Sequence, residues 1–137
     1  MGIFHVTGSL AHPSRPRRRR EVRFLVDTGA FYTMVPRDLL AELKVLPIRE
    51  ERVEFADGRK GRWKVGEARL TVDGRSVTTL VFFGPRGSQP LLGAFSLEGL
   101  ALTVDPARRR LVPMPYVIMA AARAGSSAIT AAGSRWW

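Results

Sequence analysis

The fold can be inferred from one stretch of this sequence, Phe24-Leu25-Val26-Asp27-Thr28-Gly29-Ala30. Its apolar residues indicate a buried strand, and Gly29 allows the backbone to turn where that strand ends. A lone carboxylate at the end of a buried strand is unfavourable unless a neighbouring group stabilises or protonates it. Asp27 is therefore the residue that most needs a chemical explanation.

The composition indicates one globular domain. A chain of 137 residues, 45% of them apolar, can bury roughly two thirds of its unfolded surface. The absence of cysteine excludes disulfides and thiolate chemistry and suits a cytoplasmic location. His5 and His12 are far in sequence from any carboxylate cluster, so we expect no metal site and no cofactor. We also expect neither a signal peptide nor a membrane span.

The chain is strongly basic, with 22 Lys and Arg against 12 Asp and Glu and a formal net charge of +10. Such a charge suggests an anionic partner, either nucleic acid or a membrane surface. Arginine is concentrated at residues 15, 17–20 and 108–110. No aromatic residues are interleaved for base stacking, so solvated loops are the simpler interpretation of these clusters.

Outward from Asp27, the pattern predicts a mostly-β chain with one or two short helices. Apolar alternation and turn signals indicate strands at residues 3–7, 21–26, 53–56, 62–72, 77–83, 101–104 and 110–112. Helices are predicted over residues 36–43, ended by Pro47, and over 95–100. Residues 8–20 are predicted to form an exposed loop. Asp73-Gly74 predicts a tight hairpin, and Asp57-Gly58 predicts a hairpin with a longer, mobile tip.

One short pattern occurs twice in the chain. An apolar pair, a two-residue step, Gly29-Ala30 and an apolar helix are matched by Leu91-Leu92-Gly93-Ala94 and the helix that follows it. Either two common strand-to-helix turns coincide, or the subunit is pseudo-symmetric with two halves flanking one cleft.

A pair of aspartates in contact would explain the placement of Asp27. At about 3 Å and an effective dielectric near 20, two carboxylates repel by roughly 5–6 kcal/mol, so the pair holds one proton. One aspartate then acts as general base on a water while the other protonates a carbonyl oxygen. Thr28 can donate a hydrogen bond that holds the turn, and Gly29 lets a backbone amide approach the carboxylate.

The second carboxylate has to come from another copy of the chain. No other aspartate follows a buried apolar run and precedes Thr-Gly or Ser-Gly. These other aspartates are Asp38, Asp57, Asp73 and Asp105. A two-fold axis between two Asp27 side chains supplies the pair from one sequence, which predicts a homodimer.

These motifs resemble the retroviral-type (retropepsin-like) aspartic proteases, and more closely the small prokaryotic single-domain members of that clan. The resemblance rests on Asp27-Thr28-Gly29-Ala30, the hairpin around Ala56-Asp57-Gly58, and Leu91-Leu92-Gly93 before a helix, and it covers roughly residues 2–115. One departure is the charged hairpin tip, Asp57-Gly58-Arg59-Lys60-Gly61, where viral members have a glycine-rich one.

The resemblance implies a mostly-β, closed-barrel-like subunit with one or two short helices that acts as a symmetric homodimer. Its activity would be the hydrolysis of peptide bonds without a metal or a covalent intermediate. The protease subunit is expected over residues 1–116, and residues 117–137 are expected to be a C-terminal tail, partly helical or disordered.

The resemblance also implies a set of site residues. They are Asp27 as the catalytic residue; Thr28, Gly29 and Ala30 as support for its turn; Ala56, Asp57 and Gly58 in a substrate flap over residues 53–65; and Leu91, Leu92 and Gly93 packed beside the turn.

Two other functions stay open. A non-catalytic dimeric binding module of the same fold would explain the motifs, although it has no need of the unfavourable carboxylate of Asp27. A basic nucleic-acid-binding β domain rests on the net charge alone, and it predicts binding that weakens steeply with salt.

Overall fold

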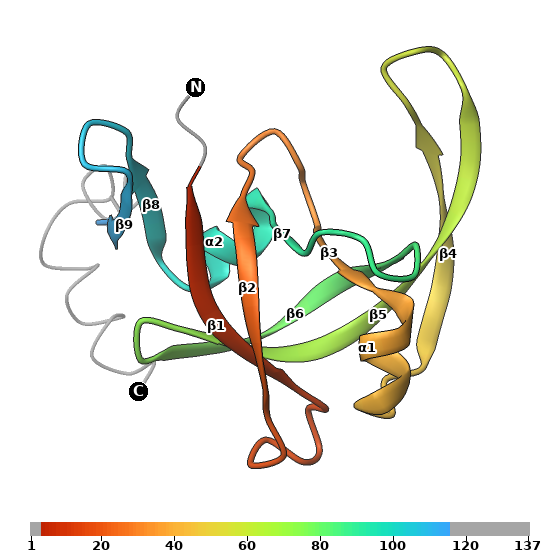
Figure 1. Ribbon diagram of the computed structural model, residues 1–137, viewed down its shortest axis with the longest axis horizontal. Helices are drawn as coiled ribbons and strands as arrows, with labels where there is room; N and C mark the ends of the chain where they lie inside the picture. Colours follow the sequence, from red (N-terminus) through yellow and green to blue (C-terminus); the bar gives the residue numbers. More distant parts are fainter. Residues whose placement is uncertain (1–3, 116–137) are drawn as a thin grey trace, which may run out of the picture.

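A computed structural model describes residues 4–115 of the chain (Figure 1). These residues form β1 (His5–Ala11), β2 (Arg20–Val26), β3 (Thr33–Pro36), α1 (Arg37–Glu42), β4 (Pro47–Glu54), β5 (Lys60–Val72), β6 (Arg75–Gly84), β7 (Leu91–Leu92), α2 (Ala94–Gly99), β8 (Leu102–Asp105) and β9 (Arg110–Pro113). Within this part of the chain, no helix is long and apolar enough to cross a bilayer. The predicted tail over residues 117–137 lies outside the described residues.

Seven strands form one sheet in the order β1-β2-β7-β3-β6-β5-β4, and β8 and β9 form a separate antiparallel pair. β1 also pairs with β5 over Ser9–Ala11. Hydrogen-bonded neighbours therefore lead from β1 through β2, β7, β3, β6 and β5 back to β1, while β4 pairs with β5 alone. The prediction of a mostly-β fold with two short helices is confirmed.

One apolar core joins these strands to both helices. In β2, Val22, Phe24 and Val26 are buried and alternate with more exposed residues, as the sequence pattern predicted. The largest fully buried apolar side chains come from β2, β1, α1, β5 and β7, and they are Phe24, Leu10, Leu40, Leu70 and Leu92. Burial of this apolar surface is the main term that holds the sheet together and fixes the end of β2.

β1 is longer than predicted, and the loop expected over residues 8–20 begins only after Ala11. We expected Gly8 to break the strand. However, a Cβ on Gly8 would lie 2.7 Å from the Thr71 carbonyl oxygen, so glycine here allows β1 to approach β5 closely. Leu10 and Ala11 are fully buried, and their burial favours a strand over an exposed loop.

The first helix and the strands after it also differ from the prediction. α1 is followed by Lys44 in a left-handed conformation, with φ 64°, which ends the helix before Pro47. Pro47 instead begins β4, and the strands predicted at 53–56 and 62–72 are parts of the longer β4 and β5. The Asp73-Gly74 hairpin is confirmed, since both of its residues have the positive φ that a two-residue turn requires.

Candidate active site

The turn after β2 is held by backbone hydrogen bonds around Asp27. The Asp27 N–H donates to the Leu92 carbonyl at 3.0 Å, and the Ala30 N–H donates to the Asp27 carbonyl at 3.1 Å. The Gly29 N–H donates to the carboxylate Oδ1 at 3.0 Å, a charge-assisted bond that orients the side chain. Asp27 is half-buried and Thr28 is exposed in the single chain. The carboxylate is thus fixed in position and still open to a partner.

The two segments that share the Gly-Ala pattern lie side by side. β2 and β7 pair in parallel, with Leu25 opposite Leu91 and Val26 opposite Leu92. The Ala94 N–H then donates to the Ala30 carbonyl at 2.9 Å. The Leu91-Leu92-Gly93 segment therefore lies against the Asp27 turn.

Gly93 makes this contact possible because it has no side chain. A Cβ at this position would lie 2.6 Å from the carbonyl carbon of Tyr32 and 2.8 Å from the carbonyl oxygen of Phe31. The backbone of Gly93 is extended, with φ −93°, and any residue can adopt that conformation. The requirement for glycine is therefore steric.

Three buried hydroxyls lie behind the contact between Gly93 and the backbone after the Asp27 turn, and the sequence analysis did not predict them. The Ser96 Oγ lies 2.7 Å from the Thr33 Oγ1 and 2.8 Å from the Thr79 Oγ1. The Gly93 N–H donates to the Thr33 Oγ1 at 3.1 Å. None of the three side chains is more than 3% exposed. Single hydroxyl residues in apolar strands and helices give no signal in sequence, because only the fold brings β3, β6 and α2 together.

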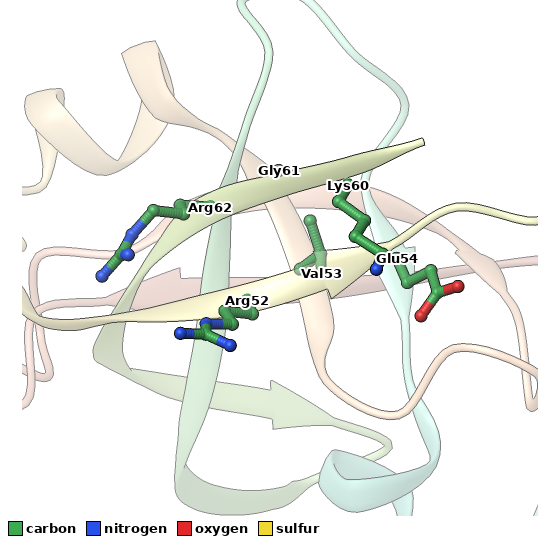
Figure 2. Close-up of a pocket in the computed structure, with 6 residues that line it drawn as sticks. All are labelled: Arg52, Val53, Glu54, Lys60, Gly61 and Arg62. Carbon is green, nitrogen blue, oxygen red and sulfur yellow. The ribbon is translucent and has the colours of Figure 1, made fainter. Parts of the chain in front are cut away.

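The β4–β5 hairpin continues beyond the sheet as a two-stranded arm, residues 49–64. β5 pairs with β6 only from Val65 onward, so the earlier part of β5 pairs with β4 alone. Figure 1 shows the end of the arm well separated from the loop that follows β2. Figure 2 shows the middle of the arm, where Val53 and Gly61 face each other across the two strands. The predicted flap is therefore a projecting ribbon in the single chain.

The tip of the arm is a tight turn, which corrects the prediction of a long one. The Phe55 N–H donates to the Arg59 carbonyl at 2.8 Å, which leaves only Ala56, Asp57 and Gly58 in the turn. Gly58 has φ 87° and supplies the left-handed residue that a three-residue hairpin turn requires. The Asp57 carboxylate accepts the Arg59 N–H at 3.0 Å and pairs with the Arg59 Nε at 2.7 Å.

Six aromatic rings form a continuous row from α2 to the tip of the arm. Neighbouring ring centroids are 5.1–6.0 Å apart, in the order Phe95, Phe31, Tyr32, Phe82, Trp63 and Phe55. The row begins beside the Asp27 turn, where Phe31 is 62% exposed. Arg49 donates to the Tyr32 hydroxyl at 3.3 Å, and its hydrogen bond to Glu51 raises the pKa of the guanidinium. Apart from the consecutive Phe31 and Tyr32, these rings are far apart in the sequence, and no pattern in it indicates that they are neighbours.

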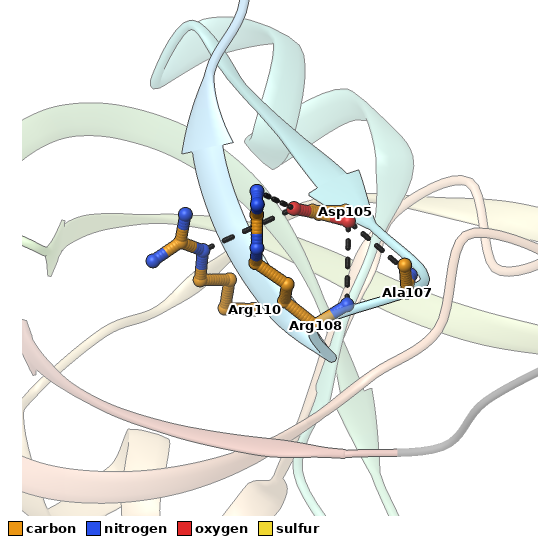
Figure 3. A network of polar contacts seen from close by, with 4 residues as sticks. All are labelled: Asp105, Ala107, Arg108 and Arg110. Atoms are coloured by element: carbon orange, nitrogen blue, oxygen red, sulfur yellow. Dashed lines mark hydrogen bonds and ion pairs between the residues drawn. The ribbon is translucent and has the colours of Figure 1, made fainter.

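The other aspartates are engaged in turns and loops on other elements. Asp105 accepts hydrogen bonds from the N–H groups of Ala107 and Arg108 and pairs with the guanidinium groups of Arg108 and Arg110 (Figure 3). Asp38 accepts the Gly87 N–H at 3.3 Å, and Asp73 lies in the β5–β6 turn. Across residues 4–115, no three His, Asp or Glu side chains are grouped so that they could hold a metal ion.

The fold is similar to that of a retroviral protease. The solution structure of the Simian Foamy Virus (mac) protease matches with a TM-score of 0.51 at 20% sequence identity, over 69% of this chain and 92% of that chain. At this identity the likeness establishes the fold alone. No curated protein sequence matches the chain.

The sequence profile of the aspartyl protease family matches residues 18–94, which is more than half of the chain. The matched segment includes the Asp27 turn, the arm and Leu91-Leu92-Gly93. The chain therefore belongs to the aspartyl protease family, and its predicted resemblance to the retropepsin-like members is confirmed.

Proposed function

We propose that the protein is an aspartic endopeptidase whose active site forms between two copies of the chain. Each copy contributes one Asp27, and a water held by the two carboxylates attacks the peptide carbonyl. One observation carries the proposal: the single Asp-Thr-Gly of the sequence lies at the end of β2, where the Leu92 carbonyl holds the Asp27 backbone and the Gly29 N–H orients its half-buried carboxylate. Membership of the aspartyl protease family supports the same reaction.

In the proposed mechanism the two carboxylates share one proton, because two full negative charges in contact repel each other. The ionised carboxylate accepts a proton from the water as the water oxygen bonds to the carbonyl carbon. The protonated carboxylate gives its proton to the carbonyl oxygen. The tetrahedral intermediate then collapses and the C–N bond breaks: the carboxylate that took the proton of the water gives it to the leaving nitrogen, and the other carboxylate takes a hydroxyl proton back from the intermediate, which restores the shared proton.

The other site residues have supporting roles in this proposal. The aromatic row forms a wall for apolar side chains of the peptide, and the arm closes over the substrate. The supporting residues are Thr28, Gly29 and Ala30 in the turn, Leu91, Leu92 and Gly93 packed beside it, and Ala56, Asp57 and Gly58 at the tip of the arm.

The first test replaces the carboxylate without changing its size. Asp27→Asn should lower cleavage of a peptide library at mildly acidic pH by at least about a thousandfold, because both the base and the shared proton are lost. Asp73→Asn is the matched control and should cleave as fast as the parent, since Asn tolerates the left-handed turn. Cleavage by Asp27→Asn at the parent rate contradicts the proposal. A stable dimer that cleaves nothing would instead favour the binding module.

Mixing the two chains tests the shared site directly. Equal amounts of parent and Asp27→Asn chains, left to exchange, should retain about a quarter of the parent activity, because only parent–parent pairs hold two aspartates. A site contained within one chain would retain about half. Sedimentation that finds only monomers at the assay concentration, with substrate present, would also contradict a shared site.

A further inference from the structure

The arm carries a like-charged pair that the fold does not explain. Arg52 and Arg62 are directly opposite each other in the β4–β5 register. Opposed like charges destabilise a strand pair, so a free protein gains nothing from this arrangement. Arg52, Arg62 and Glu54 share one face of the arm, and in Figure 2 both guanidinium groups extend along the arm in the direction away from Glu54. Glu50 lies 3.4 Å from Arg62, but within residues 4–115 no carboxylate forms an ion pair with Arg52.

Further cations share this face of the arm. Side chains alternate along a strand, so Lys60, Arg62 and Lys64 project from the same side of β5. All three are exposed. In the part of the chain that the structure describes, neither lysine forms an ion pair. Glu54 and Glu50 lie opposite Lys60 and Lys64 in the register, so this face carries four cations against two carboxylates, and positive charge is in excess.

A groove extends this charged face toward α1. It has a volume of about 450 Å³, and its lining includes Arg37, Arg62 and Lys64 together with the apolar Phe83 and Pro85. A second pocket of about 530 Å³ along the arm also includes Arg62, with Arg52 and Lys60 beside it. We call the two together the cationic groove. Its cations are Arg37, Arg52, Lys60, Arg62 and Lys64.

We propose that the cationic groove binds an acidic, extended segment of the protein substrate. Carboxylates of such a segment would relieve the repulsion between Arg52 and Arg62, and the apolar part of the groove suits a polypeptide. The inference rests on the proposed function, in which the arm closes over the substrate. A segment docked on the arm raises the effective concentration of the linked cleavage site near the carboxylates.

Nucleic acid fits this groove less well than an acidic peptide does. Single strands bind through aromatic faces on which bases stack. The Trp63 ring is packed edge-on against Phe55 and Phe82, so it is already engaged within the aromatic row.

The binding test uses the Asp27→Asn chain, so that cleavage does not interfere. The probe is a fluorescein-labelled peptide of alternating glutamate and serine, and a glutamine-serine peptide is the uncharged control. Adding Arg52→Gln and Arg62→Gln should weaken binding of the acidic probe by at least about tenfold. The matched control, Arg17→Gln with Arg19→Gln in the β1–β2 loop, removes the same charge and should weaken binding by less than about twofold.

Three results would contradict the proposal that the cationic groove binds an acidic segment. Equal weakening by both double variants would show that net charge alone attracts the probe. Failure of the acidic probe to bind better than the glutamine-serine peptide would show that the groove does not recognise carboxylates. Tighter binding of a polyuridine strand of matched length would assign the surface to nucleic acid.

A cleavage assay separates this inference from the proposed function. Attaching the acidic segment to a cleavable peptide should lower KM for the parent chain by about tenfold while kcat stays the same. Arg52→Gln with Arg62→Gln should abolish this gain, and Arg17→Gln with Arg19→Gln should keep it. Probe binding without any Asp27-dependent cleavage would contradict the proposed peptidase activity but not the proposed binding of an acidic segment. Asp27-dependent cleavage with no gain from the acidic segment would contradict only the proposed binding.

Discussion

The turn that carries Asp27 and the arm that carries the cationic groove are held in opposite ways. The turn is bonded to β7 and α2 and is backed by three buried hydroxyls. The two strands of the arm, residues 49–64, pair only with each other. A Cβ at Gly93 would collide with backbone at 2.6 Å, whereas a Cβ at Gly61 in the arm would meet its nearest atoms at 3.7 Å. Tertiary packing thus fixes the first region, and local pairing fixes the second.

This difference suits the proposed roles of the two regions, catalysis at the Asp27 turn and covering of the substrate by the arm. A carboxylate pair has to be held in place to share a proton and a water, which packing from several elements achieves. A two-stranded ribbon without a third strand is marginally stable on its own. Its position can therefore change on ligand binding at a low cost in free energy, which a substrate-covering arm needs.

The largest expected effect comes from filling the contact beside the Asp27 turn. Gly93→Ala should lower the free energy of unfolding by about 3 kcal/mol, because the atoms in the way are backbone and cannot swing aside. Gly61→Ala is the matched change in the arm and should be neutral or stabilising by about 0.5 kcal/mol, since Ala loses less chain entropy than Gly. Urea denaturation measures both variants. Similar changes in the free energy of unfolding for the two variants would contradict the contrast between the tightly packed Asp27 turn and the arm.

A smaller loss should follow from emptying the hydroxyl cluster. Ser96→Ala should lower the free energy of unfolding by about 2 kcal/mol, because the buried hydroxyls of Thr33 and Thr79 lose their shared partner. Ser76→Ala removes an exposed hydroxyl contact with Thr71, and it should cost at most about 0.5 kcal/mol. Thermal unfolding of both variants in the same buffer makes the comparison. An equal cost for the two serines would show that the cluster does not stabilise the turn.

The smallest effect has the opposite sign and is confined to the arm. Arg52→Gln should stabilise the arm by about 0.2–1 kcal/mol, because it removes the charge opposed to Arg62. Amide hydrogen exchange in the arm should slow at low salt, and the gain should shrink as salt screens the repulsion. Arg17→Gln, in the β1–β2 loop, should leave exchange in the arm unchanged. Faster exchange after Arg52→Gln would mean that the arginine stabilises the arm, and it would remove the reason to look for an anionic ligand.

Local signals predicted the elements that local chemistry decides. The strand before Asp27, the Asp73-Gly74 hairpin and the helix after Gly93 were each inferred from periodicity or from residues suited to a turn. The errors at Pro47 and at the tip of the arm are local, but one error arose where a distant segment overrode a local signal. Gly8 was taken for a break in the strand, yet it lies in β1 because β5 approaches at that point.

The sequence by itself determined that one Asp-Thr-Gly ends a buried strand, and that its chemistry would need a second chain. Apolar spacing and turn residues are enough for that inference, because they act between near neighbours. Only the tertiary structure decided that Gly93 packs against the backbone beside the Asp27 turn, that three buried hydroxyls lie behind this contact, and that six aromatic rings form a row reaching the arm. Most of these groups are far apart along the chain, and they come within contact distance because the strands and α2 that carry them pack around one apolar core.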